Sequence, residues 1–404
     1  MVTNLAIEAL EASPVPQLQC ESDVGIATVP LAQEVSFGSW QQAIPAEYWE
    51  LGAEELVARV RAARAELGTR AIVLGHHYQR EDIIQFADVR GDSFMLAQYA
   101  AERPESEYIV FCGVHFMAEA ADIVSAPHQQ VILPNIEAGC SMADMAAPGD
   151  VRAAWRELEE LFGGSEDLIP VTYMNSAASL KAFCGEHGGV VCTSSNAVKV
   201  LEWAFERGKR AFFFPDQHLG RNTGHAMGIP LEEMALWNWR LPAGGLGGAT
   251  PEDLERSRII LWQGHCSVHQ RFSVTQIEAA RERYAKARIV VHPECRYDVV
   301  EAADANGSTA YIARYVAEAP AGAVIGIGTE INLVSRLAKE HPDKTVFCLD
   351  PVVCPCSTMY RVHPAYLAWV MESLVAGRVV NQIVVPEGER APARLALDRM
   401  LALR

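Results

Sequence analysis

The amino-acid sequence predicts an α/β fold made of three similar αβα units, each with a parallel sheet. Three apolar stretches run directly into polar residues: RAIVLGHHYQ (70–79), LIPVTYMNS (168–176) and ARIVVHPEC (287–295). Each is followed by a Ser or Thr ahead of a helical pattern, by a second apolar strand, and by a last strand that ends near a cysteine. Strands that are apolar throughout and alternate with helices are typical of parallel βαβ units covered on both faces.

The three stretches also share their internal spacing. From the polar strand end to the hydroxyl at the helix start there are 17 residues (His76 to Ser93), 21 residues (Tyr173 to Ser194) and 17 residues (His292 to Thr309). Ligands of parallel sheets bind beyond the carboxyl ends of the strands. We therefore expect the units in a pseudo-threefold arrangement around a central active site. Two unrelated α/β domains with chance similarity are the alternative.

The chain divides accordingly into four segments. Residues 1–50 are an N-terminal extension, residues 51–150 the first unit, and residues 151–275 the second unit. Residues 276–404 are the third unit with C-terminal helices. The Gly- and Pro-rich stretch 241–252 predicts a surface loop inserted in the second unit.

Composition excludes several classes of protein. The 404 residues carry a formal net charge of −17, which argues against a nucleic-acid partner because phosphates are neutralised by clustered Lys and Arg. The longest apolar runs are far shorter than the roughly 20 residues of a membrane helix. Ten cysteines without a secretory signal argue against a disulfide scaffold and for a cytoplasmic protein.

Three cysteines occupy the same place in the three units, after the last strand: Cys140, Cys266 and Cys356. Three converging thiolates suit a [4Fe-4S] cluster in which one iron has no protein ligand. Such an iron is a Lewis acid that binds carboxylate and hydroxyl groups. A zinc site and three packed cysteines are the alternatives, and Cys354 is a rival of Cys356 as the third ligand.

Polar residues at the strand and helix ends are candidates for binding and proton transfer. Ser93, Ser194 and Thr309 open helices, where a hydroxyl is either an ordinary N-cap or part of an anion site. His, Tyr and Glu side chains at the first strand ends are acid–base candidates. These are His76, His77, Tyr78, Tyr173, Asn175, His292 and Glu294, with His218, Arg221, Glu330 and Asn332 on the next strand ends as supports or loop caps.

At this point the ordered motifs resemble the quinolinate synthase family. The resemblance runs from about residue 75 to the end of the third unit. It is carried by HHYQ, GDSF, GVHFMAE, CSMAD, VTYMN, CTSSNA, PDQHLGRNTG, WQGHCSVH, VHPEC, GST, GTEINLV and CSTMYRVHP.

The resemblance implies a transferase of NAD biosynthesis that condenses iminosuccinate with dihydroxyacetone phosphate to quinolinate, releasing phosphate and water. It implies a [4Fe-4S] cluster on Cys140, Cys266 and Cys356, and a functional link to L-aspartate oxidase. Catalytic residues would be Tyr78, Tyr173, His292 and Glu294. Residues matching the family's substrate contacts are His76, Ser93, Tyr173, Met174, Asn175, Ser194, His292, Pro293, Glu294 and Thr309.

One departure concerns the third cysteine. Some relatives carry CxxCxxC there, whereas this chain has only Cys354-Pro355-Cys356, which leaves Cys354 without a role. Two other functions remain open. An aconitase-like iron–sulfur dehydratase would have a similar cluster and anion sites. A cluster-bearing sensor without turnover would have a coordinatively closed cluster.

Overall fold

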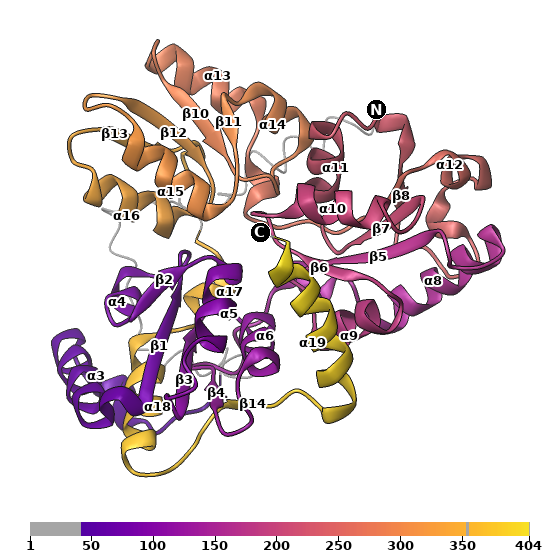
Figure 1. The fold of residues 1–404 in the computed structure, drawn as a ribbon. Helices are drawn as coiled ribbons and strands as arrows, with labels where there is room; N and C mark the ends of the chain where they lie inside the picture. The colour runs from indigo at the N-terminus through magenta and orange to yellow at the C-terminus, as the bar shows by residue number, and fades with distance from the viewer. Residues whose placement is uncertain (1–41, 353–354, 404) are drawn as a thin grey trace, which may run out of the picture.

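Three separate sheets organise the chain, which confirms the predicted repeat of α/β units (Figure 1). The structure, a computed structural model, describes residues 42–352 and 355–403. Most of the predicted extension 1–50, and also Cys354, lie outside the described residues. Within them, no helix is both long enough and apolar enough to cross a membrane.

The first unit begins with α2 (Glu47–Glu50), α3 (Ala53–Leu67) and the 3-10 turn η2 (Gly68–Arg70). Its strands are β1 (Ala71–His76), β2 (Val89–Gly91), β3 (Tyr108–Cys112) and β4 (Gln130–Ile132). Between and after them come α4 (Glu81–Ile84), α5 (Ser93–Ala101), α6 (His115–Val124) and α7 (Ser141–Asp144).

The second unit carries α8 (Pro148–Phe162), β5 (Leu168–Tyr173), α9 (Ala178–Glu186), β6 (Val190–Cys192), α10 (Ala197–Phe205) and β7 (Arg210–Phe214). It continues with α11 (Gln217–Ala226), η3 (Leu231–Glu233), β8 (Met234–Trp237), η4 (Leu246–Gly248), α12 (Pro251–Arg256), β9 (Ile259–Trp262) and η5 (His269–Arg271).

The third unit contains α13 (Val274–Arg283), β10 (Arg288–Val291), α14 (Tyr297–Ala302), β11 (Ala305–Asn306), α15 (Thr309–Glu318), β12 (Val324–Gly328), α16 (Ile331–Glu340) and β13 (Thr345–Cys348). The chain ends with α17 (Ser357–Tyr360), α18 (Pro364–Val375), β14 (Gln382–Ile383) and α19 (Glu387–Ala402).

The same strand order recurs in all three sheets. It is β2-β1-β3-β4 in the first, β6-β5-β7-β9 in the second and β11-β10-β12-β13 in the third, and all these pairs are parallel. Two sheets carry one further strand beside the last of these four. In the first sheet it is the antiparallel β14, and in the second it is the parallel β8.

A side chain repeats together with the strand order. Asp88 accepts a 2.7 Å hydrogen bond from the N–H of Val73 on β1, and Asp304 accepts one of 2.7 Å from Ile289 on β10. By strand register the corresponding residue of β5 is Pro170, which has no N–H to donate. The second unit therefore needs no carboxylate at this place.

The C-terminal segment leaves the third unit, although the sequence places residues 276–404 in one segment. Helix α18 packs on α3, and β14 pairs with β4 of the first sheet. Helix α19, yellow in Figure 1, packs on α9 and β6 of the second unit. The segment buries apolar residues such as Leu367 and Leu397 against partners that only the folded first and second units provide.

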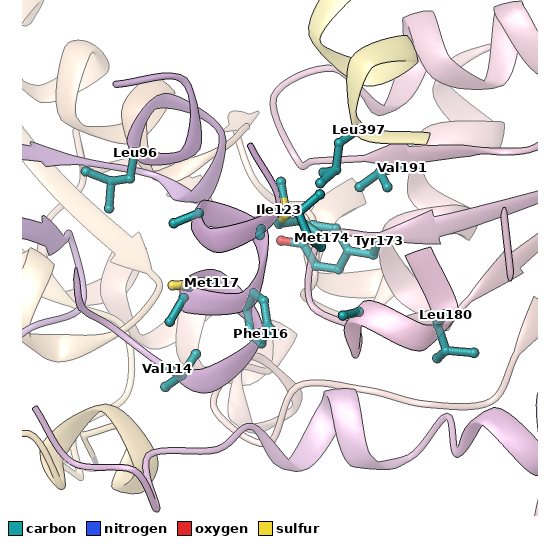
Figure 2. Close-up of a cluster of buried hydrophobic side chains, with 14 of the residues drawn as sticks. Leu96, Val114, Phe116, Met117, Ile123, Tyr173, Met174, Leu180, Val191 and Leu397 are labelled. Carbon is teal, nitrogen blue, oxygen red and sulfur yellow. The ribbon is translucent and has the colours of Figure 1, made fainter. Parts of the chain in front are cut away.

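The first two units share one hydrophobic core. Figure 2 shows Phe116 and Ile123 of α6 close to Tyr173 and Met174 at the end of β5. The third unit has two smaller clusters of its own, which include Ile277 and Ile312. The third sheet is thus a separately packed body that meets the other two around the central cavity and also outside it, as where α11 packs on α14.

The predicted surface loop 241–252 contains η4 and the first turn of α12. The carboxylate of Glu157 on α8 accepts hydrogen bonds of 2.7 and 2.9 Å from the N–H groups of Gly244 and Leu246. The loop is therefore held on the second unit and does not contribute to the walls of the central cavity.

Candidate active site

One cavity is lined by residues from all three units, at the carboxyl ends of their strands. Twelve of the fourteen site residues singled out in the sequence line it: His76, Tyr78, Ser93, Cys140, Tyr173, Asn175, Ser194, Cys266, His292, Glu294, Thr309 and Cys356. The other two, Met174 and Pro293, do not line it. Met174 is buried in the shared core, and the carbonyl of Pro293 accepts a hydrogen bond from Asn222.

The strand ends deliver equivalent residues to this cavity. By register, His76, Tyr173 and His292 occupy the same position in the three units, directly at the end of the first strand. Two residues further on, Tyr78, Asn175 and Glu294 are also equivalent, and all six line the cavity. The internal repeat therefore presents two rings of polar side chains, one residue from each unit in each ring.

A continuous hydrogen-bonded chain joins Tyr173 to Tyr78 through the third unit. The Tyr173 hydroxyl donates to Oε1 of Glu294 at 2.6 Å, and Oε2 of Glu294 lies 2.8 Å from Nδ1 of His269. Nε2 of His269 lies 3.0 Å from the Thr329 hydroxyl, which lies 2.7 Å from the Tyr78 hydroxyl. Such a chain can move a proton between the two phenols without bulk water.

Two members of this chain, His269 and Thr329, were missed by the sequence reasoning. His269 is fully buried and stacks on His292 with ring centroids 4.5 Å apart. It lies three residues after Cys266 in the motif WQGHCSVH, and Thr329 directly precedes Glu330 in GTEINLV. Both motifs were recognised, but neither pattern indicates which of its polar residues joins this hydrogen-bonded chain.

Burial makes most of these groups neutral. It lowers the pKa of His292 to about 3, lowers the pKa of His76 well below its usual range, and raises the pKa values of Tyr78 and Tyr173 well above theirs. Burial also opposes ionisation of Glu294, but His292, His269 and the bond from Tyr173 outweigh it and lower the pKa of this carboxyl. Glu294 is thus favoured as a carboxylate, beside the phenol of Tyr173, which burial keeps neutral.

The hydroxyls at the helix starts are not the N-caps. Asp92 caps α5 by accepting a 2.9 Å bond from Met95, and Ser308 caps α15 by accepting a 3.3 Å bond from Tyr311. Ser93 and Thr309 each follow the N-cap by one residue, so their hydroxyls do not cap the helix. Among the described residues, the buried Thr309 hydroxyl has no hydrogen-bond partner. A ligand oxygen in the cavity would satisfy it.

The three cysteines have one local geometry. Cys140 and Cys356 are the N-cap residues of α7 and α17, and Cys266 precedes the turn at His269. Burial raises the pKa of each thiol, while the N–H of the residue three positions later favours the thiolate: Ala143 for Cys140, His269 for Cys266 and Met359 for Cys356. Cys356 raises the pKa of Cys140 and of Cys266, and Cys140 raises that of Cys266, as expected for a cluster of thiols.

A second donor set overlaps this one. Ligand atoms of Cys266, His269 and Glu294 all lie within 4.8 Å of one another, which would suit a metal ion with mixed ligands. His269 and Glu294 are already hydrogen-bonded to each other and to Thr329 and Tyr173. The three cysteines have no such competing bonds to carboxylate or imidazole, so we favour them as the ligand set.

The other cysteines that the structure describes, and the other polar candidates, lie outside the cavity wall. Cys112, Cys184, Cys192 and Cys295 are fully buried in the cores, and Cys348 ends β13. His218 binds Gln270 at 2.7 Å, and Arg221 lies against His218 and Gln217. Glu330 is fully buried and accepts a 3.2 Å hydrogen bond from the N–H of Cys356. This bond fixes the backbone of the third cysteine.

Comparison with known proteins decides the family. The family model described as quinolinate synthetase A protein matches residues 58–402. The chain belongs to the quinolinate synthase family. The quinolinate synthase of Corynebacterium glutamicum is 58% identical over 363 residues, covering 90% of this chain and 91% of the relative. That of Anoxybacillus flavithermus is 52% identical (89% and 96% covered), and that of Streptomyces coelicolor is 54% identical (86% and 88% covered).

The donor set of this quinolinate synthase family member fits an iron–sulfur cluster. The three thiols lie on the wall of one cavity and each faces a backbone N–H, which is the kind of hydrogen bond that stabilises cluster sulfur. Because burial keeps an isolated thiol protonated, a bound cation is what would favour three thiolates here. With three protein ligands, one iron of a four-iron cluster would remain open toward the cavity.

Proposed function

We propose that the protein is a cytoplasmic quinolinate synthase of NAD biosynthesis, which condenses iminosuccinate with dihydroxyacetone phosphate and releases phosphate and water. The observation that carries the proposal is the convergence of three thiols, the hydroxyls of Ser93, Ser194 and Thr309, and the carboxylates of Asp92 and Glu294 on a single cavity. The family membership supports the same reaction.

Neutral hydrogen-bond donors would bind the substrates. Both substrates are anionic, yet no Lys or Arg lines the described cavity. The hydroxyls of Ser93, Ser194 and Thr309, with the N–H groups of the adjacent helix starts, are suited to carboxylate and phosphate oxygens. His76 and His292, neutral through burial, would add hydrogen bonds without repelling or over-stabilising the anions.

Proton transfer would run through the chain from Tyr173 to Tyr78. Glu294 is the ionised member of this chain because its pKa is lowered, and His269 and Thr329 connect it to the Tyr78 hydroxyl. Condensation and ring closure require protons to be taken from carbon and nitrogen and given to departing oxygen. A closed cavity also limits hydrolysis of the reactive imine by water.

Cys140, Cys266 and Cys356 would hold a [4Fe-4S] cluster, which when bound supplies a Lewis acid for loss of a hydroxyl group as water. The cluster thus belongs on the same wall as the hydroxyls that anchor the substrate.

The test is an anaerobic preparation in which iron and sulfide are quantified and quinolinate is assayed from dihydroxyacetone phosphate and freshly generated iminosuccinate. A four-iron cluster together with quinolinate formation supports the proposal. A cluster without quinolinate would overturn it in favour of the dehydratase, which a panel of hydroxy acids would then identify, or of the sensor. Supplying iminosuccinate through an L-aspartate oxidase in the same vessel tests that link: direct transfer predicts a faster rate than the free imine supports.

A further inference from the structure

The side chain of Asn222 reaches from the second unit into the third and binds on both sides of Glu294. Its Nδ2 donates two hydrogen bonds of 2.8 Å, one to the carbonyl of Pro293 and one to the carbonyl of Cys295. The residue is 6% exposed, so water competes little for these bonds. Both hydrogens of the amide are used on the two peptide groups that flank a single carboxylate residue.

The local sequence explains why Asn222 faces the third unit. Helix α11 is capped by Asp216 and carries Gly220 and Gly224 one turn apart. A Cβ at Gly220 would lie 2.5 Å from Leu261, and one at Gly224 would lie 2.5 Å from Ile259, so this face lies directly on the sheet. Asn222 is two residues from each glycine and therefore projects from the opposite face of the helix.

Keeping the amide in this orientation has a cost. Oδ1 of Asn222 is buried and has no partner among the described residues. An unpaired buried carbonyl oxygen destabilises a fold. This cost is offset by the two hydrogen bonds that the amide of Asn222 donates to the carbonyls of Pro293 and Cys295. These carbonyls lie in the turn 292–295, in which the Cys295 N–H donates to the His292 carbonyl at 3.0 Å.

We propose that Asn222 is a positioning residue that holds the turn 292–295 so that Glu294 meets Tyr173 and His269 at the same time. The carboxylate must span a Tyr hydroxyl of the second unit at 2.6 Å and an imidazole at 2.8 Å. The third sheet has its own core, so its position relative to the second unit depends on contacts of this kind. The catalytic part of the proposal rests on the proposed function, whereas the positioning part does not.

The first test measures the position of the turn without any assay of activity. Amide hydrogen exchange is followed in peptides covering residues 289–300 for the wild type, Asn222→Ala and the isosteric Asn222→Asp. Loss of both donors should speed exchange there by about tenfold or more. The matched control is Gln129→Ala. Gln129 is a buried amide that also donates to two carbonyls, those of Arg103 and Ser106, in the first unit. It should change exchange only near residues 103–129.

The second test asks whether Asn222 acts through Glu294. In the anaerobic assay, Asn222→Ala should lower kcat by about tenfold or more while KM for dihydroxyacetone phosphate changes less than about threefold. In a Glu294→Gln background the same substitution should have little further effect, because the two residues act as a unit. Iron content should equal that of the wild type.

The outcomes separate the two proposals. Unchanged exchange at 289–300 in both Asn222 variants overturns the positioning role, whatever the enzyme makes. Faster exchange in the Asn222 variants, together with a wild type that makes no quinolinate, leaves the positioning role standing and overturns the proposed function. Additive losses in the double variant, or a loss of kcat equal to that of Gln129→Ala, would show that Asn222 contributes only to general stability.

Discussion

The hydroxyl of Tyr173 donates a 2.6 Å hydrogen bond to Glu294, although 121 residues separate the two in the chain. Tyr173 ends β5 of the second sheet, and Glu294 follows β10 of the third sheet. One bond therefore joins two separately packed units at the centre of the cavity. The carboxylate of Glu294 also binds His269. Both bonds can form only when the second and third units have the correct relative position.

Removing this bond should impair turnover more than stability. Tyr173→Phe is expected to lower kcat by about 100-fold, because a positioned proton-transfer group contributes that order of rate. The matched control is Tyr48→Phe, since Tyr48 donates an equal 2.6 Å bond to Glu372 in the first unit, away from the cavity. Tyr48→Phe should lower the melting temperature and leave kcat unchanged. Wild-type turnover in Tyr173→Phe would exclude a role in proton transfer.

The cluster ligands can be separated from the other cysteines by metal analysis. Cys140→Ser, Cys266→Ser and Cys356→Ser should each lose most of the bound iron and sulfide and all quinolinate formation. Cys348→Ser is the control within the third unit, because this thiol binds the Thr329 carbonyl and does not line the cavity. Cys354→Ser should also retain iron. If Cys354→Ser loses iron and Cys356→Ser retains it, the third ligand is Cys354.

Thr309 and its neighbour Ser308 should show opposite effects. Thr309→Val removes a buried hydroxyl without a partner among the described residues, so it should raise KM by about tenfold while leaving the free energy of unfolding unchanged or slightly higher. Ser308→Ala removes the N-cap of α15 and should cost about 1 kcal/mol of stability with little change in KM. Steady-state kinetics and urea unfolding measure both. An unchanged KM in Thr309→Val would exclude a substrate contact.

A fully buried lysine gives a test with a defined dependence on pH. Burial lowers the pKa of Lys181 to about 8, and its ammonium donates to the Ser176 carbonyl beside Asn175. Because the pKa of Lys181 in the folded protein lies below its usual value of 10.5, the charged form destabilises the fold below pH 8, and this cost fades as pH rises from 8 to 10.5.

Lys181→Met should therefore raise the free energy of unfolding by up to about 3 kcal/mol at pH 7, and by only about 1 kcal/mol at pH 9.5. Urea unfolding of the metal-free protein at both values measures the gap. Activity should fall, because the turn that carries Asn175 loses its bond. A stability gap that is constant with pH would show that the pKa of Lys181 is the same in the folded and unfolded protein, and so is not lowered by burial.

Local pattern was sufficient for much of the fold. An apolar strand that stops at a polar residue, as at His76 and His292, marks the carboxyl end of a parallel strand whether or not its partners are known. The repeat therefore predicted the α/β units, and it brought Cys140, Cys266 and Cys356 to one cavity. These predictions depend on periodicity and spacing, which are properties of the chain itself.

The hydroxyls at the helix starts show what the local sequence pattern could not predict. Ser93 and Thr309 were candidates for capping or for anion binding, and the sequence left both open. Only the backbone of the folded chain shows that Asp92 and Ser308 are the caps, one residue earlier. A shift of one residue turns a side chain by about 100° around a helix, which propensity cannot resolve.

The sequence by itself determined three things: the α/β units with parallel sheets, the carboxyl ends of their strands, and the polar residues at those strand ends. What only the tertiary structure decided is which distant groups meet: His269 with Glu294, Thr329 with Tyr78, Asn222 with the turn at Pro293, and the C-terminal helix with the first two units. Strand and helix patterns arise from interactions between near neighbours in the chain. Contacts between units depend on how whole sheets pack, which no short segment of sequence specifies.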